Sequence, residues 1–303
     1  MTDLSGRQYR LESGSYRATV ASVGASLREL TFDGRRLVVP FNAAEVRPAF
    51  RGATLAPWPN RVVDGTYSFD GTDYQLSLTE PSRHHALHGL AGWLDFSALE
   101  ESADRLVLGA TVEAQVGYPF RLELRIEFRL DDGGLHWSVS ALNTGALAAP
   151  FGTGPHPYLV AGDGHVDDWA LELPASSVLT VTADRLIPLD LDTVEGGEFD
   201  FRSSRTIADT FIDHAFTDIT RNENGLASVR VLSMAGTGVG MSWGTDCPWV
   251  QVHTADRPAP EPSRIGLAVE PMTCPPDAFN SGTDLLVIQP GESASAGWSI
   301  HAI

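Results

Sequence analysis

Residues 121–130 of this chain read RLELRIEFRL, in which charged and apolar residues alternate without a break. A period of two is typical of a β-strand with one face in solvent and one face buried. The next four residues, DDGG, are of kinds that tolerate a positive φ, and residues 135–140, LHWSVS, then run back as a partner strand. The sequence therefore predicts a β-hairpin over residues 121–140.

The same turn chemistry recurs in the first third of the chain. Asp33-Gly34 and Asp70-Gly71 each stand between two short, largely apolar segments, which predicts two further hairpins. Later segments are also short and rich in β-branched or aromatic residues, as strands are. These later candidate strands are residues 169–173, 178–182, 229–233, 239–243, 249–253, 265–270 and 285–288.

Helical signals are weak throughout. No window shows a sustained helical period that ends in a recognisable cap, which disfavours a doubly wound nucleotide-binding fold. Residues 256–262, DRPAPEP, are expected to form an exposed loop, because proline cannot donate a hydrogen bond to a sheet. We predict an all-β fold, a single large antiparallel β-sandwich, with residues 1–303 as one domain.

Composition limits the partners and the location. A formal net charge of -18 repels phosphate backbones and anionic lipids, so we expect no nucleic-acid and no membrane partner. The N-terminus lacks a signal peptide and no apolar run would span a bilayer, which predicts a cytoplasmic protein. Cys247 and Cys274 are far apart and outside any Cys-x-x-Cys spacing, which indicates buried thiols, with a single distant disulfide as the alternative. We expect a monomer or weak homodimer that binds a small molecule.

Glu270 is a candidate general base. It ends the apolar segment 265–269 and is followed at once by Pro271, which predicts a carboxylate where a buried strand stops. Partial burial there would raise its pKa and make it a better proton acceptor near neutral pH. The alternative is a solvated glutamate at a strand end, as most glutamates are exposed.

His156 is a candidate proton donor. Pro155 and Pro157 fix φ on both sides of it, so its ring is expected on a stiff loop. Histidine titrates near neutral pH and works best as a catalyst on a rigid support. The alternative is a loop histidine bonded to a nearby carbonyl.

Metal and nucleophilic chemistry are disfavoured. His84, His85 and His88 are close in sequence, as zinc ligands can be, but their segment has no helical character to align the rings. There is no Gly-x-Ser-x-Gly elbow, and Cys274 lies among prolines without a local base. We expect neither a metal nor a cofactor.

Several motifs occur in a fixed order along most of the chain: PNRVVDGTY at 59–67, LHG at 87–89, HPY at 156–158, DHAF at 213–216, VEP at 269–271, PGES at 290–293 and WSI at 298–300. Taken together they resemble the aldose 1-epimerase family, also called galactose mutarotases. The resemblance implies a single large antiparallel β-sandwich, the galactose mutarotase-like supersandwich. It also implies an isomerase that interconverts the α and β anomers of an aldose.

The resemblance implies roles for individual residues. Glu270 matches the catalytic base of the family's Glu-Pro motif, and His156 matches the catalytic histidine. His88 and Asp213 match residues that hold sugar hydroxyls. The implied reaction is acid–base ring opening and reclosure, in which Glu270 takes the proton of the anomeric hydroxyl and His156 donates to the ring oxygen.

Two positions depart from the family pattern. Pro57 stands where the family often has an arginine that touches the sugar; Arg61 or Arg51 is a candidate replacement, and Trp58 could offer a ring face. We assign Arg61 to substrate binding. Pro155 replaces the common asparagine before the histidine, so the hydrogen bonding that orients His156 is expected to differ.

Three functions are compatible with these residues. The first is mutarotation of a free aldohexose such as glucose or galactose. The second is epimerisation of a phosphorylated or sulfonated hexose, which requires a local cluster of cations, for which Arg51, Arg61 and Arg83 are candidates. The third is a non-catalytic carbohydrate-binding or sensor protein. A matched proton donor and acceptor, Glu270 and His156, argues against the third.

Overall fold

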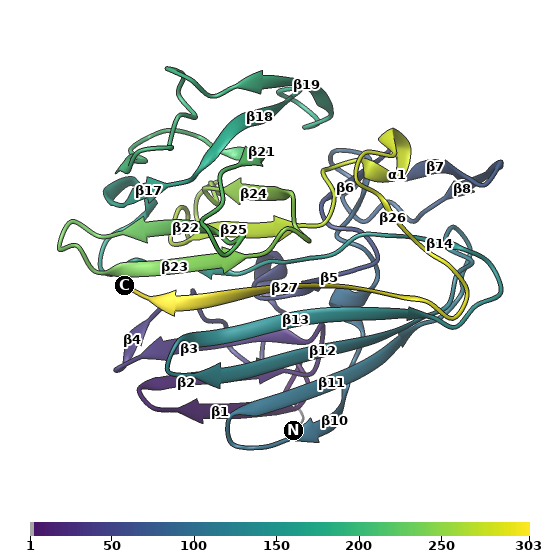
Figure 1. The fold of residues 1–303 in the computed structure, drawn as a ribbon, viewed down its shortest axis with the longest axis horizontal. Coiled ribbons are helices and arrows are strands. Elements are labelled where there is room, and N and C mark those ends of the chain that lie inside the picture. Colours follow the sequence, from purple (N-terminus) through teal and green to yellow (C-terminus); the bar gives the residue numbers. More distant parts are fainter. Residues whose placement is uncertain (1–2) are drawn as a thin grey trace.

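The computed structural model describes residues 3–303 and is built almost entirely from β-strands (Figure 1). Every named pair of strands within these residues is antiparallel, which confirms the predicted fold class. Helical elements are short: the 3-10 helices Pro48–Phe50, Ala91–Trp93 and Val166–Asp168, and α1 (Ala278–Ser281). No helix of residues 3–303 has both the length and the apolar character needed to cross a membrane.

The largest sheet has nine strands and runs across the molecule in Figure 1. In spatial order these strands are β10 (Ser97–Glu101), β11 (Arg105–Val112), β12 (Leu122–Asp131), β13 (Gly134–Asn143), β27 (Ser293–Ala302), β23 (Gly238–Trp243), β22 (Ala227–Leu232), β17 (Ala170–Glu172) and β20 (Arg205–Thr206). A four-stranded sheet packs β1 and β2 against β11, β12 and β13. Its strands are β1 (Gln8–Ser13), β2 (Tyr16–Ala21), β3 (Ser26–Phe32) and β4 (Arg35–Arg36).

A six-stranded sheet carries much of the functional site. In spatial order its strands are β16 (Tyr158–Leu159), β25 (Leu267–Met272), β24 (Trp249–His253), β21 (Asp213–Ile219), β18 (Ala175–Val181) and β19 (Pro188–Thr193). Four two-stranded ribbons complete the fold. They pair β14 (Ala149–Phe151) with β26 (Leu286–Ile288), β15 (Gly154–Pro155) with β5 (Thr54–Leu55), β6 (Arg61–Val63) with β9 (His85–Leu87), and β7 (Thr66–Phe69) with β8 (Thr72–Gln75).

The predicted hairpin over residues 121–140 is confirmed as β12 and β13. Along β12 the apolar residues are buried and the charged residues lie outward, and Phe128 on β12 pairs with Trp137 on β13. The return at Gly134 requires glycine, because its φ is +119° and a Cβ there would collide with the Ile300 carbonyl of β27. The turn residue thus lets the hairpin pair with the C-terminal strand.

The other sequence predictions hold with adjustments. The turns Asp33-Gly34 and Asp70-Gly71 close hairpins, but residues 37–39 are not a strand beyond a single bridge from Val38 to Leu159. The proline-rich segment is irregular and exposed from residue 257 to 262. Both cysteines are free and buried, and burial raises the pKa of the Cys274 thiol to about 12.

Candidate active site

Four polar side chains share one face of the six-stranded sheet. They lie on the neighbouring strands β21, β24 and β25, where Asp213 pairs with His253 and Gln251 pairs with Glu270. Because residues two apart on a strand face the same side and cross-strand partners lie together, the four side chains converge. All four line one cavity.

His156 reaches this cavity from the loop between β15 and β16. Its backbone N–H donates to the carbonyl of Ala53 (3.0 Å), and its carbonyl accepts from the N–H of Gly52 (2.8 Å). Gly52 has a φ of +66°, and a Cβ there would collide with the Leu27 carbonyl. These contacts, together with the flanking prolines, hold the His156 ring in place.

His88 and Asn60 fix each other at the opposite wall. Both have left-handed backbones, with φ of 62° and 52°, which non-glycine residues adopt rarely. The Asn60 N–H donates to His88 Nδ1 (3.2 Å), and the His88 N–H donates to the Asn60 carbonyl (2.8 Å). Since Nδ1 is an acceptor and burial lowers the pKa of His88 well below its usual value, the neutral ring carries its proton on Nε2.

Arg61 is held by acidic residues rather than left free. Its Nε and Nη2 donate to the two carboxylate oxygens of Glu80 at 2.7 and 3.1 Å, and Nη2 is 3.9 Å from Asp213 Oδ2. Arg83 donates to the same Glu80 at 2.8 Å.

The carboxyl group of Asp213 is ionised more readily than usual. Burial favours its neutral form, but the charges of His253 and Arg61 and a hydrogen bond from Gln251 (2.7 Å) outweigh burial and lower the pKa of Asp213.

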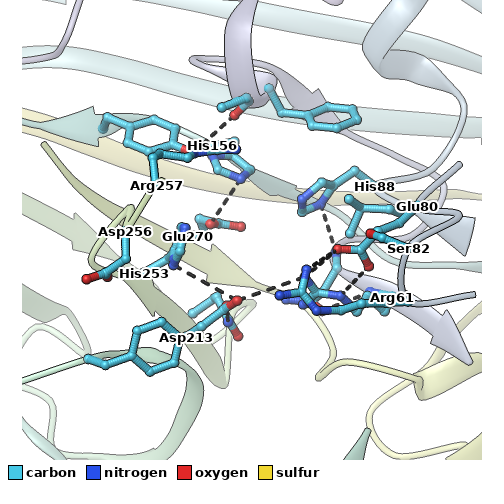
Figure 2. Close-up of a pocket in the computed structure, with 18 of the residues that line it drawn as sticks. Arg61, Glu80, Ser82, His88, His156, Asp213, His253, Asp256, Arg257 and Glu270 are labelled. Atoms are coloured by element: carbon cyan, nitrogen blue, oxygen red, sulfur yellow. Dashed lines mark hydrogen bonds and ion pairs between the residues drawn. The ribbon is translucent and has the colours of Figure 1, made fainter. Parts of the chain in front are cut away.

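The cavity has a volume of about 560 Å³, within the usual range for small-molecule sites. Figure 2 shows Glu270 and His156 facing His88 and Arg61 across it. Thus all the residues that the sequence assigned to catalysis or substrate binding lie at one site. They are Glu270, His156, His88, Asp213 and Arg61.

Glu270 and His156 are in direct contact. His156 Nε2 lies 3.4 Å from Glu270 Oε1, and both side chains are almost fully buried. Burial, followed by repulsion from Asp213, raises the pKa of Glu270 well above its usual value. Burial, followed by the charge of His253, lowers the pKa of His156 to about 3. Each group is therefore pushed toward its neutral form.

The alternative interpretations of these two residues are wrong. Glu270 is not a solvated strand end: it is 2% exposed and β25 continues through Pro271 to Met272. His156 is not anchored to a carbonyl through its ring, since Nε2 faces Glu270 and Nδ1 has no hydrogen-bond partner within residues 3–303. The side chains of Glu270 and His156, the base and the acid expected from the sequence, are thus direct neighbours.

Other expectations for this region need correction. The Trp58 ring does not face the cavity: it is buried against Phe279, and its Nε1 donates to the Ala86 carbonyl. His84 and His85, which the sequence analysis disfavoured as metal ligands, do not line the cavity with His88, and His85 Nε2 contacts the Arg185 carbonyl. Of the two candidates to replace the arginine at Pro57, Arg61 lines the cavity.

Sequence reasoning missed several lining residues. Gln251 and His253 belong to the segment WVQVH, predicted as a strand, where polar residues interrupt an apolar run. That interruption in a buried strand is the signal that could have identified them. Glu80 and Arg257 also line the cavity, and neither has a local pattern that distinguishes it from a surface charge.

Comparisons with known proteins agree with this geometry. The sequence model of a family described as aldose 1-epimerase matches residues 7–301. The uncharacterized protein YihR of Escherichia coli is 38% identical over 98% of this chain and 94% of its own length. The galactose mutarotase of Sus scrofa is 24% identical over 98% of this chain and 94% of its own length.

Among solved structures, a GalM/aldose epimerase homologue from C. elegans matches with a TM-score of 0.86 at 21% identity, over 98% of each chain. This likeness places the strand layout in the class of galactose mutarotase-like folds. The chain belongs to the aldose 1-epimerase family, and it is therefore an isomerase that acts on carbohydrates. The resemblance noted from the sequence motifs is confirmed.

Proposed function

We propose that this isomerase interconverts the α and β anomers of an aldohexose with a free anomeric hydroxyl, such as glucose or galactose, and that Glu270 and His156 are its acid–base pair. The observation that carries the proposal is their contact at 3.4 Å, buried at the wall of a polar cavity. Binding alone needs no such pair, which favours turnover over a sensor function.

The pair holds one proton in its working state. In the neutral arrangement the proton is on Glu270 and the imidazole is free; in the ionic arrangement Glu270 is a carboxylate and His156 is protonated on Nε2. Both arrangements contain the same number of protons, so the pair titrates as a unit. Burial favours the neutral arrangement. When sugar hydroxyls contact Glu270 and His156, they stabilise the ionic arrangement of the two side chains.

Ring opening starts from the ionic arrangement. Glu270 takes the proton of the anomeric hydroxyl while His156 donates its Nε2 proton to the ring oxygen, and the bond between the anomeric carbon and the ring oxygen breaks. The products are the open-chain aldehyde, a protonated Glu270 and a neutral His156. The open-chain stage thus coincides with the neutral arrangement that burial favours.

Reclosure reverses the transfers after rotation about the bond between the first two carbons. His156 takes the proton of the hydroxyl that attacks the aldehyde, and Glu270 returns a proton to the carbonyl oxygen. The pair ends in its starting state, so no cofactor is consumed. Positioned proton transfer of this kind contributes roughly a hundred- to ten-thousandfold in rate.

The facing wall supplies the groups that orient the sugar. The Nε2–H of His88 is a donor, since Nδ1 accepts from Asn60. Asp213 is an anionic acceptor, held by Gln251. Arg61, fixed by Glu80, adds donors in a rigid fork. The three residues are proposed to hold hydroxyls while the pair acts on the anomeric centre.

Polarimetry tests the proposed function. Freshly dissolved α-glucose or α-galactose should reach its equilibrium rotation faster with the protein than with the same amount of heat-inactivated protein. The control measures general buffer catalysis. An unchanged rate with both sugars at all protein concentrations would refute a neutral aldohexose as substrate.

The pH profile of kcat/KM should be broad and flat around neutrality. Activity is lost on the acid side only when the pair takes up a second proton. Because the pKa of His156 is low, about 3, this loss occurs well below neutral pH. Activity is lost on the alkaline side when the pair loses its shared proton. Because the pKa of Glu270 is raised, this loss occurs at a higher pH than for an ordinary glutamate. Exchange NMR between the two anomers at a series of pH values measures the profile. An acid limb at the ordinary histidine value would contradict the shared proton.

A further inference from the structure

Arg47 is a buried cation beside the active site. It is 4% exposed and forms no ion pair within residues 3–303. Its guanidinium group donates instead to the carbonyls of Val23 (3.2 Å) and Gly92 (2.5 Å) and to the hydroxyl of Ser26 (2.5 Å). Burial lowers the pKa of Arg47 to about 10, which leaves it charged at neutral pH. A buried charge without a counterion is costly, so packing alone does not explain an arginine here.

Aromatic rings connect Arg47 to the cavity. Its Cζ lies 4.6 Å from the ring centroid of Trp93 and 5.9 Å from that of Phe50. Phe50 lines the cavity, and its ring centroid is 4.7 Å from that of His88 and 6.4 Å from that of His156. The two histidine rings meet edge to face with centroids 4.9 Å apart. Arg47 does not line the cavity itself, so Phe50 links it to both histidines.

The backbone that carries Phe50 is strained. Ala49 and Phe50 have consecutive left-handed conformations, with φ of 50° and 53°, which non-glycine residues adopt rarely. Such a conformation persists only where the surrounding contacts over-determine it. The Ala49 carbonyl accepts from the Tyr158 hydroxyl (3.1 Å), and the Phe50 carbonyl accepts from the Ala53 N–H (2.9 Å). Arg47 adds the contact behind the Phe50 ring.

We propose that Arg47 is a positioning residue for the acid–base pair, acting through Phe50 and through its uncompensated positive charge. This inference rests on the proposed function. After burial and other charges, the charge of Arg47 is a further cause that lowers the pKa of both His88 and His156. A protonated His156 is then a stronger acid and gives its proton to the ring oxygen more readily. A neutral His88 keeps its Nε2–H as a donor to the sugar.

Other charged or titratable groups also face the pair. They are Arg61, His88, Tyr158, Asp213, His253 and Arg257. Burial and the charge of Asp213 raise the pKa of Glu270, and Arg61 lowers it. His253 and Arg47 both oppose protonation of His156, and Asp213 favours it. These six residues line the cavity, where a sugar can touch them, whereas Arg47 does not. Substitution of Arg47 therefore changes the charge near the pair without removing a sugar contact.

The test compares Arg47→Gln, which keeps a hydrogen-bond donor but loses the charge, with Arg47→Lys, which keeps the charge. Exchange NMR measures the pH profile of kcat/KM with whichever of glucose and galactose the wild type converts faster. In Arg47→Gln both limbs should move up by about one pH unit, because the pair binds its protons more tightly without the positive charge. Its kcat should fall roughly three- to tenfold with KM little changed. Arg47→Lys should keep both limbs in place.

Arg221→Gln is the matched control. Arg221 also donates to backbone carbonyls, those of Trp243, Gly244 and Cys247, and it forms no ion pair in the part of the chain that the structure describes. It does not line the cavity. Arg221→Gln should therefore leave both limbs and kcat unchanged, even if the lost hydrogen bonds lower its Tm.

Arg47→Met, which can pack on Phe50 and Trp93 without a charge, repeats the test in a second neutral variant. A folded neutral variant with both limbs in place would make Arg47 a purely structural residue and overturn the proposal. An equal shift in Arg47→Lys or in Arg221→Gln would overturn it as well. Loss of folding in both neutral variants, with Arg47→Lys folded, would assign the charge to the fold and reject its role at the pair. No acceleration by the wild type with either sugar would overturn the proposed function itself, and this inference with it.

Discussion

Glu270→Gln should reduce mutarotation by about a hundredfold to ten-thousandfold while sugar binding persists. The amide has the shape of the carboxyl but can neither take the proton of the anomeric hydroxyl nor exchange one with His156, 3.4 Å away. Exchange NMR measures the rate, and calorimetric titration with substrate measures affinity. Turnover near that of the wild type would remove Glu270 from the role of base.

Stability provides the control for this variant. The pKa of Glu270 is raised in the folded protein, so its contribution to stability is present at low pH and is lost as the pH rises through the folded value. Gln cannot ionise and lacks this penalty. The Tm of Glu270→Gln relative to wild type should therefore increase with pH. A variant that is inactive but destabilised at every pH would indicate misfolding rather than a lost base.

The sequence was informative about the strands because their pattern is local. Alternation along β12 reflects one buried and one exposed face, and Asp-Gly turns need only neighbouring residues. The fold class followed from such segments, whereas the order of strands in the sheets depends on long-range pairings that no local pattern encodes. That residues 1–303 form one domain is still a prediction.

The position of Glu270 shows where local reasoning failed. Pro271 was expected to end the strand, but it lies inside β25 opposite Val250. The N–H groups of Val269 and Thr273 point to the β15 and β16 side, so the missing N–H of Pro271 faces the same side. Strand β16 pairs only with Leu267 and Ala268, and proline is tolerated where no strand partner needs its N–H.

The site residues were predicted from motifs, but their pairings were not. His156 and Glu270 are 114 positions apart and Arg61 and Glu80 are 19 apart, so their contacts arise only from the fold. The sequence offered Arg51, Arg61 and Arg83 as equal candidates for an anion site. The structure separates them, because Glu80 neutralises two of the three.

His156→Asn should lower kcat by about a hundredfold or more while KM changes little, whereas His88→Asn or Asp213→Asn should mainly raise KM. A proton donor acts as charge develops on the ring oxygen, so its loss falls on the chemical step. A group that holds a hydroxyl contacts the bound sugar before reaction as well, so its loss weakens binding. Measuring kcat and KM of the three variants by exchange NMR compares the proton donor with the residues that hold hydroxyls.

The pH profile of His156→Asn separates a lost acid from a displaced loop. In the wild type the alkaline limb marks loss of the shared proton, so without the imidazole that limb should disappear. The remaining activity should rise with pH as Glu270 alone ionises, at a value above the usual range for glutamate because the carboxyl stays buried. A variant that kept both limbs with a uniformly lower rate would have lost alignment only. One that kept the wild-type kcat and changed only KM would make His156 a binding residue.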